Sequence, residues 1–68
     1  MKITVNGKTT ELEKSVNIAE LLIIVKAEQP DYVTVQRNDE FVDRVAFPTT
    51  FVEEGDNIEF LYFMGGGK

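Results

Sequence analysis

The sequence predicts an α+β fold in which a single helix covers one face of a mixed β-sheet. Two observations carry this prediction: strand-like alternation of apolar and polar residues near both ends of the chain, and one helical apolar pattern between them. The chain has 68 residues, of which 43% are apolar. Because a chain of about 60 residues buries only ~60% of its unfolded surface, we expect one domain with a thin core.

The N-terminal segment is typical of a β-hairpin. Ile3 and Val5 alternate with polar residues, as in a strand that is buried on one face. Asn6-Gly7 follows, and both residues accept the positive φ angles of a type I′ turn. Residues 8–12 are therefore expected to return as the second strand.

One amphipathic helix is predicted after a short connector. Asn17 is the expected N-cap, and Glu20, three residues later, completes a capping-box pattern. Four apolar residues have the spacing of one buried helical stripe: Ile18, Leu21, Leu22 and Val25. The helix is expected to end by Gln29, because Pro30 disfavours helical angles in the residue before it.

Two isoleucines of this helix lie off the buried stripe. Ile23 points nearly opposite to it, and Ile24 lies to its side. A single exposed isoleucine is ordinary on a protein surface, so weak self-association through this pair is the less favoured of two interpretations.

A pair of strands is expected in the middle of the chain. Residues 32–37 alternate between apolar and polar, with Val33 and Val35 on one face. After a turn at residues 38–40, residues 41–42 are expected to form the short partner strand.

The connection to the last strand is expected to be irregular, because Pro48 interrupts residues 43–50. Phe51 and Val52 are expected to anchor this connection in the core. Residues 53–56 have the acidic and glycine composition of a second turn.

The last strand is predicted over residues 57–63. Three alternate residues share the face that is expected to pack on the helix: Ile58, Phe60 and Tyr62. Leu61 and Phe63 then lie on the open face, where apolar side chains often mark a partner surface. The first and last strands are the most regularly apolar, so we expect them to lie side by side in a sheet of four to five strands, a β-grasp.

Composition excludes several classes of function. Seven basic and 12 acidic residues give a net charge of −5, which disfavours nucleic acid as a partner. The chain has no histidine and no cysteine, so a Ser-His-Asp or Cys-His site, a disulfide and the usual zinc sites are excluded. Five carboxylates are expected in turns or on solvent faces: Glu11, Glu13, Glu53, Glu54 and Asp56. We expect no bound metal and no bound cofactor.

Nothing in the sequence predicts a membrane protein. The longest purely apolar run, residues 21–25, is far too short to span a bilayer. Residues 1–5 have the pattern of a strand and not of a signal peptide. A cytoplasmic protein is therefore expected.

The C-terminal tail is the one place where covalent chemistry is credible. Residues 1–64 are expected to form the domain, and residues 65–68, Gly-Gly-Gly-Lys, a flexible tail. A terminal carboxylate becomes electrophilic when ATP adenylates it, and a thiol, persulfide or amine can then attack. Extended, the four residues reach ~13 Å, enough to enter a narrow active site. Alternatively, the tail is a frayed end or an added remnant.

These features together resemble the ThiS family, the sulfur-carrier proteins of thiamine biosynthesis. The resemblance lies in MKITVNG at residues 1–7, IAELL at 18–22, VTVQRNDE at 33–40, TTF at 49–51, EGDNIE at 54–59 and the final glycines. The related small subunit of molybdopterin synthase shares the ubiquitin-like β-grasp fold and the tail, but it is typically longer and ranks second.

The resemblance implies a co-substrate rather than an enzyme. A ThiF-type activating enzyme would use ATP to adenylate the terminal glycine. Sulfur from a donor such as a cysteine desulfurase would replace AMP, and thiazole synthase would take the sulfur from the resulting thiocarboxylate. In this chain the reacting carboxylate would belong to Gly67, with Gly65 and Gly66 threading the channel. Leu61, Phe63 and Met64 would contact the partner.

Two positions depart from the family pattern. The chain ends on Lys68, whose side chain should not fit a channel sized for glycine. Our hypothesis is that a C-terminal peptidase removes Lys68; alternatively, this lysine is an added residue or this member is used differently. Asn38-Asp39 also stands where Asn-Gly is usual, and aspartate tolerates left-handed angles less well than glycine.

Two other classes of protein remain open at this point. A ubiquitin-like modifier would join the same activated glycine to a lysine of a target protein. A β-grasp binding module would carry the tail without using it. The sequence does not separate the sulfur carrier from the modifier, because both need an activated terminal glycine.

Overall fold

The computed structural model of the chain describes residues 1–28 and 31–62. Residues 29–30 and residues 63–68, which include the predicted tail, lie outside this part.

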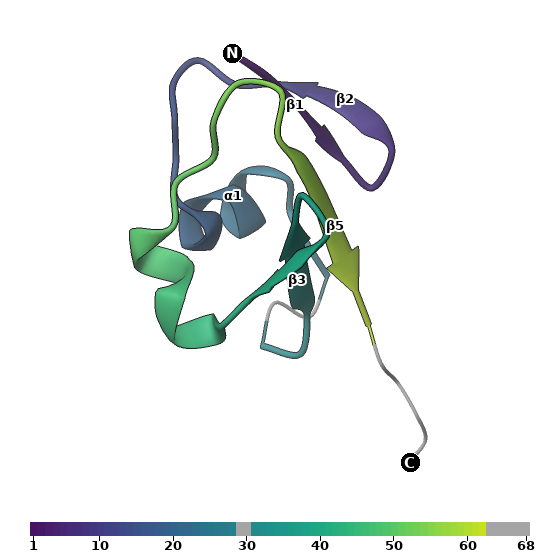
Figure 1. Cartoon of the computed structure of the whole chain (residues 1–68), viewed down its shortest axis with the longest axis vertical. Coiled ribbons are helices and arrows are strands. Elements are labelled where there is room, and N and C mark those ends of the chain that lie inside the picture. The colour runs from purple at the N-terminus through teal and green to yellow at the C-terminus, as the bar shows by residue number, and fades with distance from the viewer. Residues whose placement is uncertain (29–30, 63–68) are drawn as a thin grey trace.

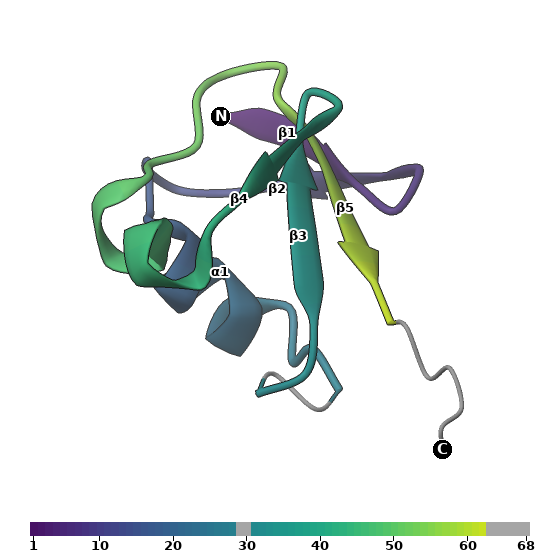
Figure 2. The same ribbon diagram turned by 60° about the horizontal axis from the view of Figure 1, so that its bottom comes forward.

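The fold has two layers, a β-sheet and a helical layer (Figure 1). In chain order the elements are β1 (Lys2–Val5), β2 (Lys8–Glu11), α1 (Ile18–Ile24), β3 (Thr34–Arg37), β4 (Glu40–Val42), the 3-10 helix η1 (Arg44–Thr49) and β5 (Asn57–Leu61). Figure 2 shows α1 on one side of the sheet, with η1 beside it. The predicted α+β class is thus confirmed.

The sheet has five strands in the order β2-β1-β5-β3-β4, so that β5 lies at its centre. β1 and β5 run parallel, with Thr4 opposite Asn57, whereas β3 runs antiparallel to β5, with Thr34 opposite Leu61. The first and last strands are therefore neighbours in a mixed sheet, as predicted, which is the arrangement of a β-grasp.

The hairpin turn has the predicted left-handed backbone. Asn6 has a φ of 52° and Gly7 a φ of 80°. The second hairpin, between β3 and β4, turns through Asn38 and Asp39, whose φ angles are 53° and 72°. Both central residues of this turn thus have left-handed angles, although Asp39 carries a side chain.

Helix α1 begins with the predicted capping box. The Asn17 side chain accepts a hydrogen bond from the Glu20 N–H at 2.7 Å, and the Glu20 carboxylate accepts one from the Asn17 N–H at 3.2 Å. The helix ends at Ile24. Ile23 is 77% exposed and Ile24 49% exposed, as their positions off the stripe predict.

The core lies between α1 and the sheet. Its buried apolar residues come from nearly every element: Ile3, Val5, Leu12, Val16, Ile18, Leu21, Leu22, Val33, Val35, Phe47, Val52, Ile58 and Phe60. Val25, the last residue of the predicted stripe, is partly buried against this cluster. No helix in the described part is long and apolar enough to cross a membrane.

The prediction for residues 43–50 was wrong in one respect, because this segment contains the 3-10 helix η1 with Pro48 inside it. Pro48 has no N–H to donate, and the Thr50 N–H bonds the Ala46 carbonyl across it at 2.9 Å. Arg44 fixes the segment to the residue before β3 by donating to the Val33 carbonyl at 2.9 Å.

The expected anchors of this segment were half right. Val52 is fully buried, but Phe51 is 50% exposed, and Phe47 of η1 is buried in its place. Phe51 forms an isolated antiparallel bridge with Asn17. In extended backbone, neighbouring side chains point to opposite sides, so burial of Val52 turns Phe51 outward.

Candidate functional site

The end of β5 is the part of the structure that leads to the predicted tail. We call residues 60–62 the tail root. β3 pairs with this segment through Thr34 opposite Leu61 and Val35 opposite Phe60. The predicted site residues Phe63, Met64 and Gly65 to Gly67 follow the tail root and lie outside the described residues.

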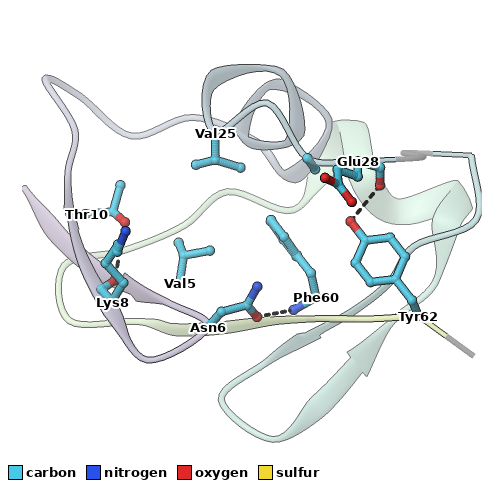
Figure 3. Close-up of a pocket in the computed structure, with 9 residues that line it drawn as sticks. Val5, Asn6, Lys8, Thr10, Val25, Glu28, Phe60 and Tyr62 are labelled. Atoms are coloured by element: carbon cyan, nitrogen blue, oxygen red, sulfur yellow. Dashed lines mark hydrogen bonds between the residues drawn. The ribbon is translucent and has the colours of Figure 1, made fainter.

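Two side-chain hydrogen bonds hold the tail root in addition to its pairing with β3 (Figure 3). The Phe60 N–H donates to the Asn6 side-chain oxygen at 2.8 Å, just beyond the point where β1 ends. The Tyr62 hydroxyl donates to the Glu28 carbonyl at 2.6 Å. The tail root is therefore bound to the first hairpin and to the segment that follows α1.

A groove of about 420 Å³ opens beside the tail root. The first hairpin, the segment after α1 and β5 form its walls, and its apolar lining comes from Val5, Val25, Ala27 and Phe60. Figure 3 shows Tyr62 closing the end of the groove next to Glu28. Sequence reasoning did not find this groove, because its walls come from segments that are distant in the chain.

The open face of the sheet carries the predicted partner residue Leu61, which is half-buried. Phe41 lies on the same face, since it is opposite Gln36, which is in turn opposite Glu59. Phe41 is 63% exposed. Sequence reasoning missed Phe41 as a surface residue, although its position beside the inward-facing Val42 was a usable signal.

Asp56 was predicted in a turn with the solvent-facing carboxylates, but it is buried, with 6% of its surface exposed. Its carboxylate accepts hydrogen bonds from the Arg37 Nε at 2.7 Å, the Glu53 N–H at 2.8 Å and the Asn38 Nδ2 at 3.1 Å. Burial opposes ionisation, but these donors, Arg37 foremost, outweigh it and hold the pKa of Asp56 below its ordinary value.

This cluster is a structural clip rather than a reactive site. The Asn38 side chain also accepts from the Asn57 N–H at 2.9 Å, so the β3–β4 turn is tied to the first residue of β5. In the described part no buried side-chain nitrogen or oxygen lacks a hydrogen-bond partner, and no group of acidic side chains is placed to bind a metal ion. The clip fixes the start of β5, at the opposite end of the strand from the tail root.

Comparison with known proteins gives consistent results. The model of the ThiS family matches residues 3–67. The crystal structure of the thiamine biosynthesis protein ThiS from Geobacter metallireducens superposes with a TM-score of 0.91 and 51% identity, covering 98% of this chain and 100% of that one. A solution structure of a thiamine biosynthesis protein from the same organism gives a TM-score of 0.77 and 51% identity, covering 100% of this chain and 90% of that one.

Two curated relatives are considerably longer than this chain. Thiazole synthase of Magnetococcus marinus is 34% identical over 68 residues, which is 100% of this chain and 21% of the relative. Thiazole synthase of Paramagnetospirillum magneticum is 31% identical over the same coverage. The chain thus spans about a fifth of the length of the curated relatives that it matches.

Proposed function

Because the chain belongs to the ThiS family of thiamine biosynthesis proteins, we propose that it is a sulfur carrier whose C-terminal glycine bears the sulfur. The observation that carries this proposal is the extent of the family match. It runs from residue 3 to residue 67 and so includes all three glycines of the tail. The chain acts as a co-substrate, and the catalytic groups belong to its partners.

The chemistry proceeds in three steps at the Gly67 carboxyl group. The carboxylate oxygen attacks the α-phosphorus of ATP on a ThiF-type activating enzyme, and pyrophosphate leaves. A persulfide sulfur, supplied by a donor such as a cysteine desulfurase, then attacks the carbonyl carbon, and AMP leaves. Thiols reduce the resulting acyl disulfide with two electrons, which releases the thiocarboxylate.

The domain and its tail suit a carrier that is acted on by partner enzymes. The glycines present no side chain to the walls of a channel, so they admit close approach of a partner's backbone. Leu61 and Phe41, on the open face, provide apolar area on which a partner can dock while the tail reacts. We extend this docking role to Phe63 and Met64, which follow the tail root in the sequence.

Thiazole synthase is the proposed acceptor of the sulfur. The support is that two curated relatives with this name contain a segment that matches this chain over its full length. In those proteins the carrier-like segment belongs to the same polypeptide as the rest of a thiazole synthase. We infer that this chain binds a separate thiazole synthase and donates its sulfur to that enzyme.

Lys68 must leave before Gly67 can be adenylated, and we propose that a C-terminal peptidase removes it. The test uses intact mass spectrometry after incubation with the activating enzyme, ATP and a sulfur donor. A variant without Lys68 is expected to gain the mass of one oxygen-to-sulfur exchange. The full chain is expected to do so only after a peptidase has removed its last residue.

The control lacks both Gly67 and Lys68 and is expected to fold normally but to gain no sulfur. If the variant without Lys68 shows no exchange, the sulfur-carrier proposal is wrong. A covalent adduct with lysines of other proteins, in place of the exchange, would instead identify a protein modifier.

A further inference from the structure

Tyr62 occupies a distinctive position at the end of the described part of β5. It is the first residue after the strand, and its ring lies on the helix side of the sheet, 36% exposed. Its hydroxyl donates to the backbone carbonyl of Glu28 at 2.6 Å, across 34 positions of sequence (Figure 3). The ladder with β3 ends one residue earlier, at Leu61.

The Tyr62 hydrogen bond therefore holds the chain one residue beyond the end of its pairing with β3. On one side of the tail root, β3 holds Leu61; on the other, Asn6 holds Phe60 through its side-chain oxygen. Neither contact reaches Tyr62. Without this hydroxyl bond, Tyr62 would form no hydrogen bond to any described residue outside β5.

We propose that Tyr62 is a positioning residue, whose bond to the Glu28 carbonyl sets the direction in which the chain leaves the domain toward its reacting end. This inference rests on the proposed function, because a direction matters only if a partner takes up the residues that follow. A tail root that is already ordered costs a partner less conformational entropy on docking. The contribution is to uptake of the carrier and not to the chemical step.

The first arm of the test measures order in the full chain without any partner. Tyr62→Phe removes the hydroxyl and keeps the ring. The backbone heteronuclear NOE at Leu61 and Tyr62 is expected to fall, with the rest of the domain unchanged. Tyr32→Phe is a matched control, because Tyr32 is 75% exposed and its hydroxyl bonds no residue that the structure describes.

The second arm measures adenylation by the activating enzyme, followed as pyrophosphate release, with Gly67 terminal in every variant. For Tyr62→Phe we expect KM for the carrier to rise about 2- to 5-fold with kcat unchanged, the size expected for one exposed hydrogen bond. Tyr32→Phe is expected to behave like the parent chain. Thermal unfolding checks that both variants are folded at the assay temperature, so that lost stability does not account for the change in KM.

The outcomes separate this inference from the proposed function. An unchanged NOE at Leu61 and Tyr62, or equal KM values for the two variants, overturns the positioning role while leaving the sulfur carrier intact. If the parent chain is not adenylated at all, the proposed function fails and the positioning role fails with it. In that case the NOE still shows whether the bond orders the tail root.

Discussion

Replacing Asp56 with asparagine should destabilise the domain strongly, although the two side chains have nearly the same shape. One carboxylate oxygen accepts from both the Arg37 Nε and the Glu53 N–H, and the other accepts from the Asn38 amide. An asparagine keeps one acceptor and turns an NH2 group toward a donor. Asn38 cannot rotate its amide to compensate, because its oxygen already accepts from the Asn57 N–H.

The expected size follows from these contacts. Hydrogen bonds to charged groups contribute about 1.5–3 kcal/mol, and breaking a fully buried ion pair costs roughly 3–5 kcal/mol. The Arg37 side chain is 29% exposed and can regain water, so the lower part of this range applies. We expect a loss of about 2 kcal/mol in the free energy of unfolding, which for a small domain lowers Tm by roughly 10 °C.

The effect should depend on pH in a defined direction. The pKa of Asp56 is lowered in the folded state, so its contribution is fully present above the unfolded value of about 3.9. The contribution is lost as the pH falls through the folded pKa. The difference in stability between the parent chain and Asp56→Asn should therefore be full at neutral pH and shrink progressively as the pH falls below 4.

Urea unfolding at neutral pH and at a series of pH values below 4 measures this difference. Glu53→Gln is the control, because its carboxylate lies 3.8 Å from the same arginine but its side chain is 79% exposed, so little change is expected. A loss below about 0.5 kcal/mol for Asp56→Asn at neutral pH would refute the reasoning, since it would be no more than an ordinary surface substitution. A difference that stays constant into acid would also refute it.

Two further substitutions test other parts of the fold. Asp39→Gly should stabilise the domain by about 0.5–1 kcal/mol in urea unfolding, because Asp39 has a φ of 72° and glycine adopts that angle without a steric penalty; a lower midpoint would contradict this. Phe47→Ala should cost about 3–5 kcal/mol. Phe51→Ala should cost much less, because Phe51 is 50% exposed, whereas Phe47 is 5% exposed. Equal losses in thermal unfolding would contradict the assignment of Phe47 as the anchor.

The sequence allowed prediction of the elements whose signals are local. The turn at Asn6-Gly7 and the box of Asn17 and Glu20 depend on residues no more than three positions apart, and both predictions are confirmed. The alternation in the last strand correctly identified Ile58 and Phe60 as core residues. In these segments the local backbone preference and the spacing of apolar side chains indicate the same structure, so the sequence pattern was sufficient to predict it.

Features that depend on distant partners could not be predicted in the same way. Asp56 resembles any turn carboxylate until Arg37, 19 residues away, is placed beside it. The choice of Phe47 over Phe51 depends on the path of η1 relative to α1, which no local period encodes. The hydrogen bond from Tyr62 to Glu28 likewise depends on the tertiary fold, because the two residues are 34 positions apart in the sequence. The site residues beyond Tyr62 remain predictions.

The central place of β5 also determines how the domain responds to force. A pull on the chain beyond Tyr62 acts along β5, which has β1 on one side and β3 on the other. Because β1 and β5 are parallel, tension between the start of β1 and the end of β5 shears their ladder and loads its bonds together, instead of opening them singly. If a partner draws on the residues beyond Tyr62, as the proposed function requires, the load is therefore shared by the ladders on both sides of β5.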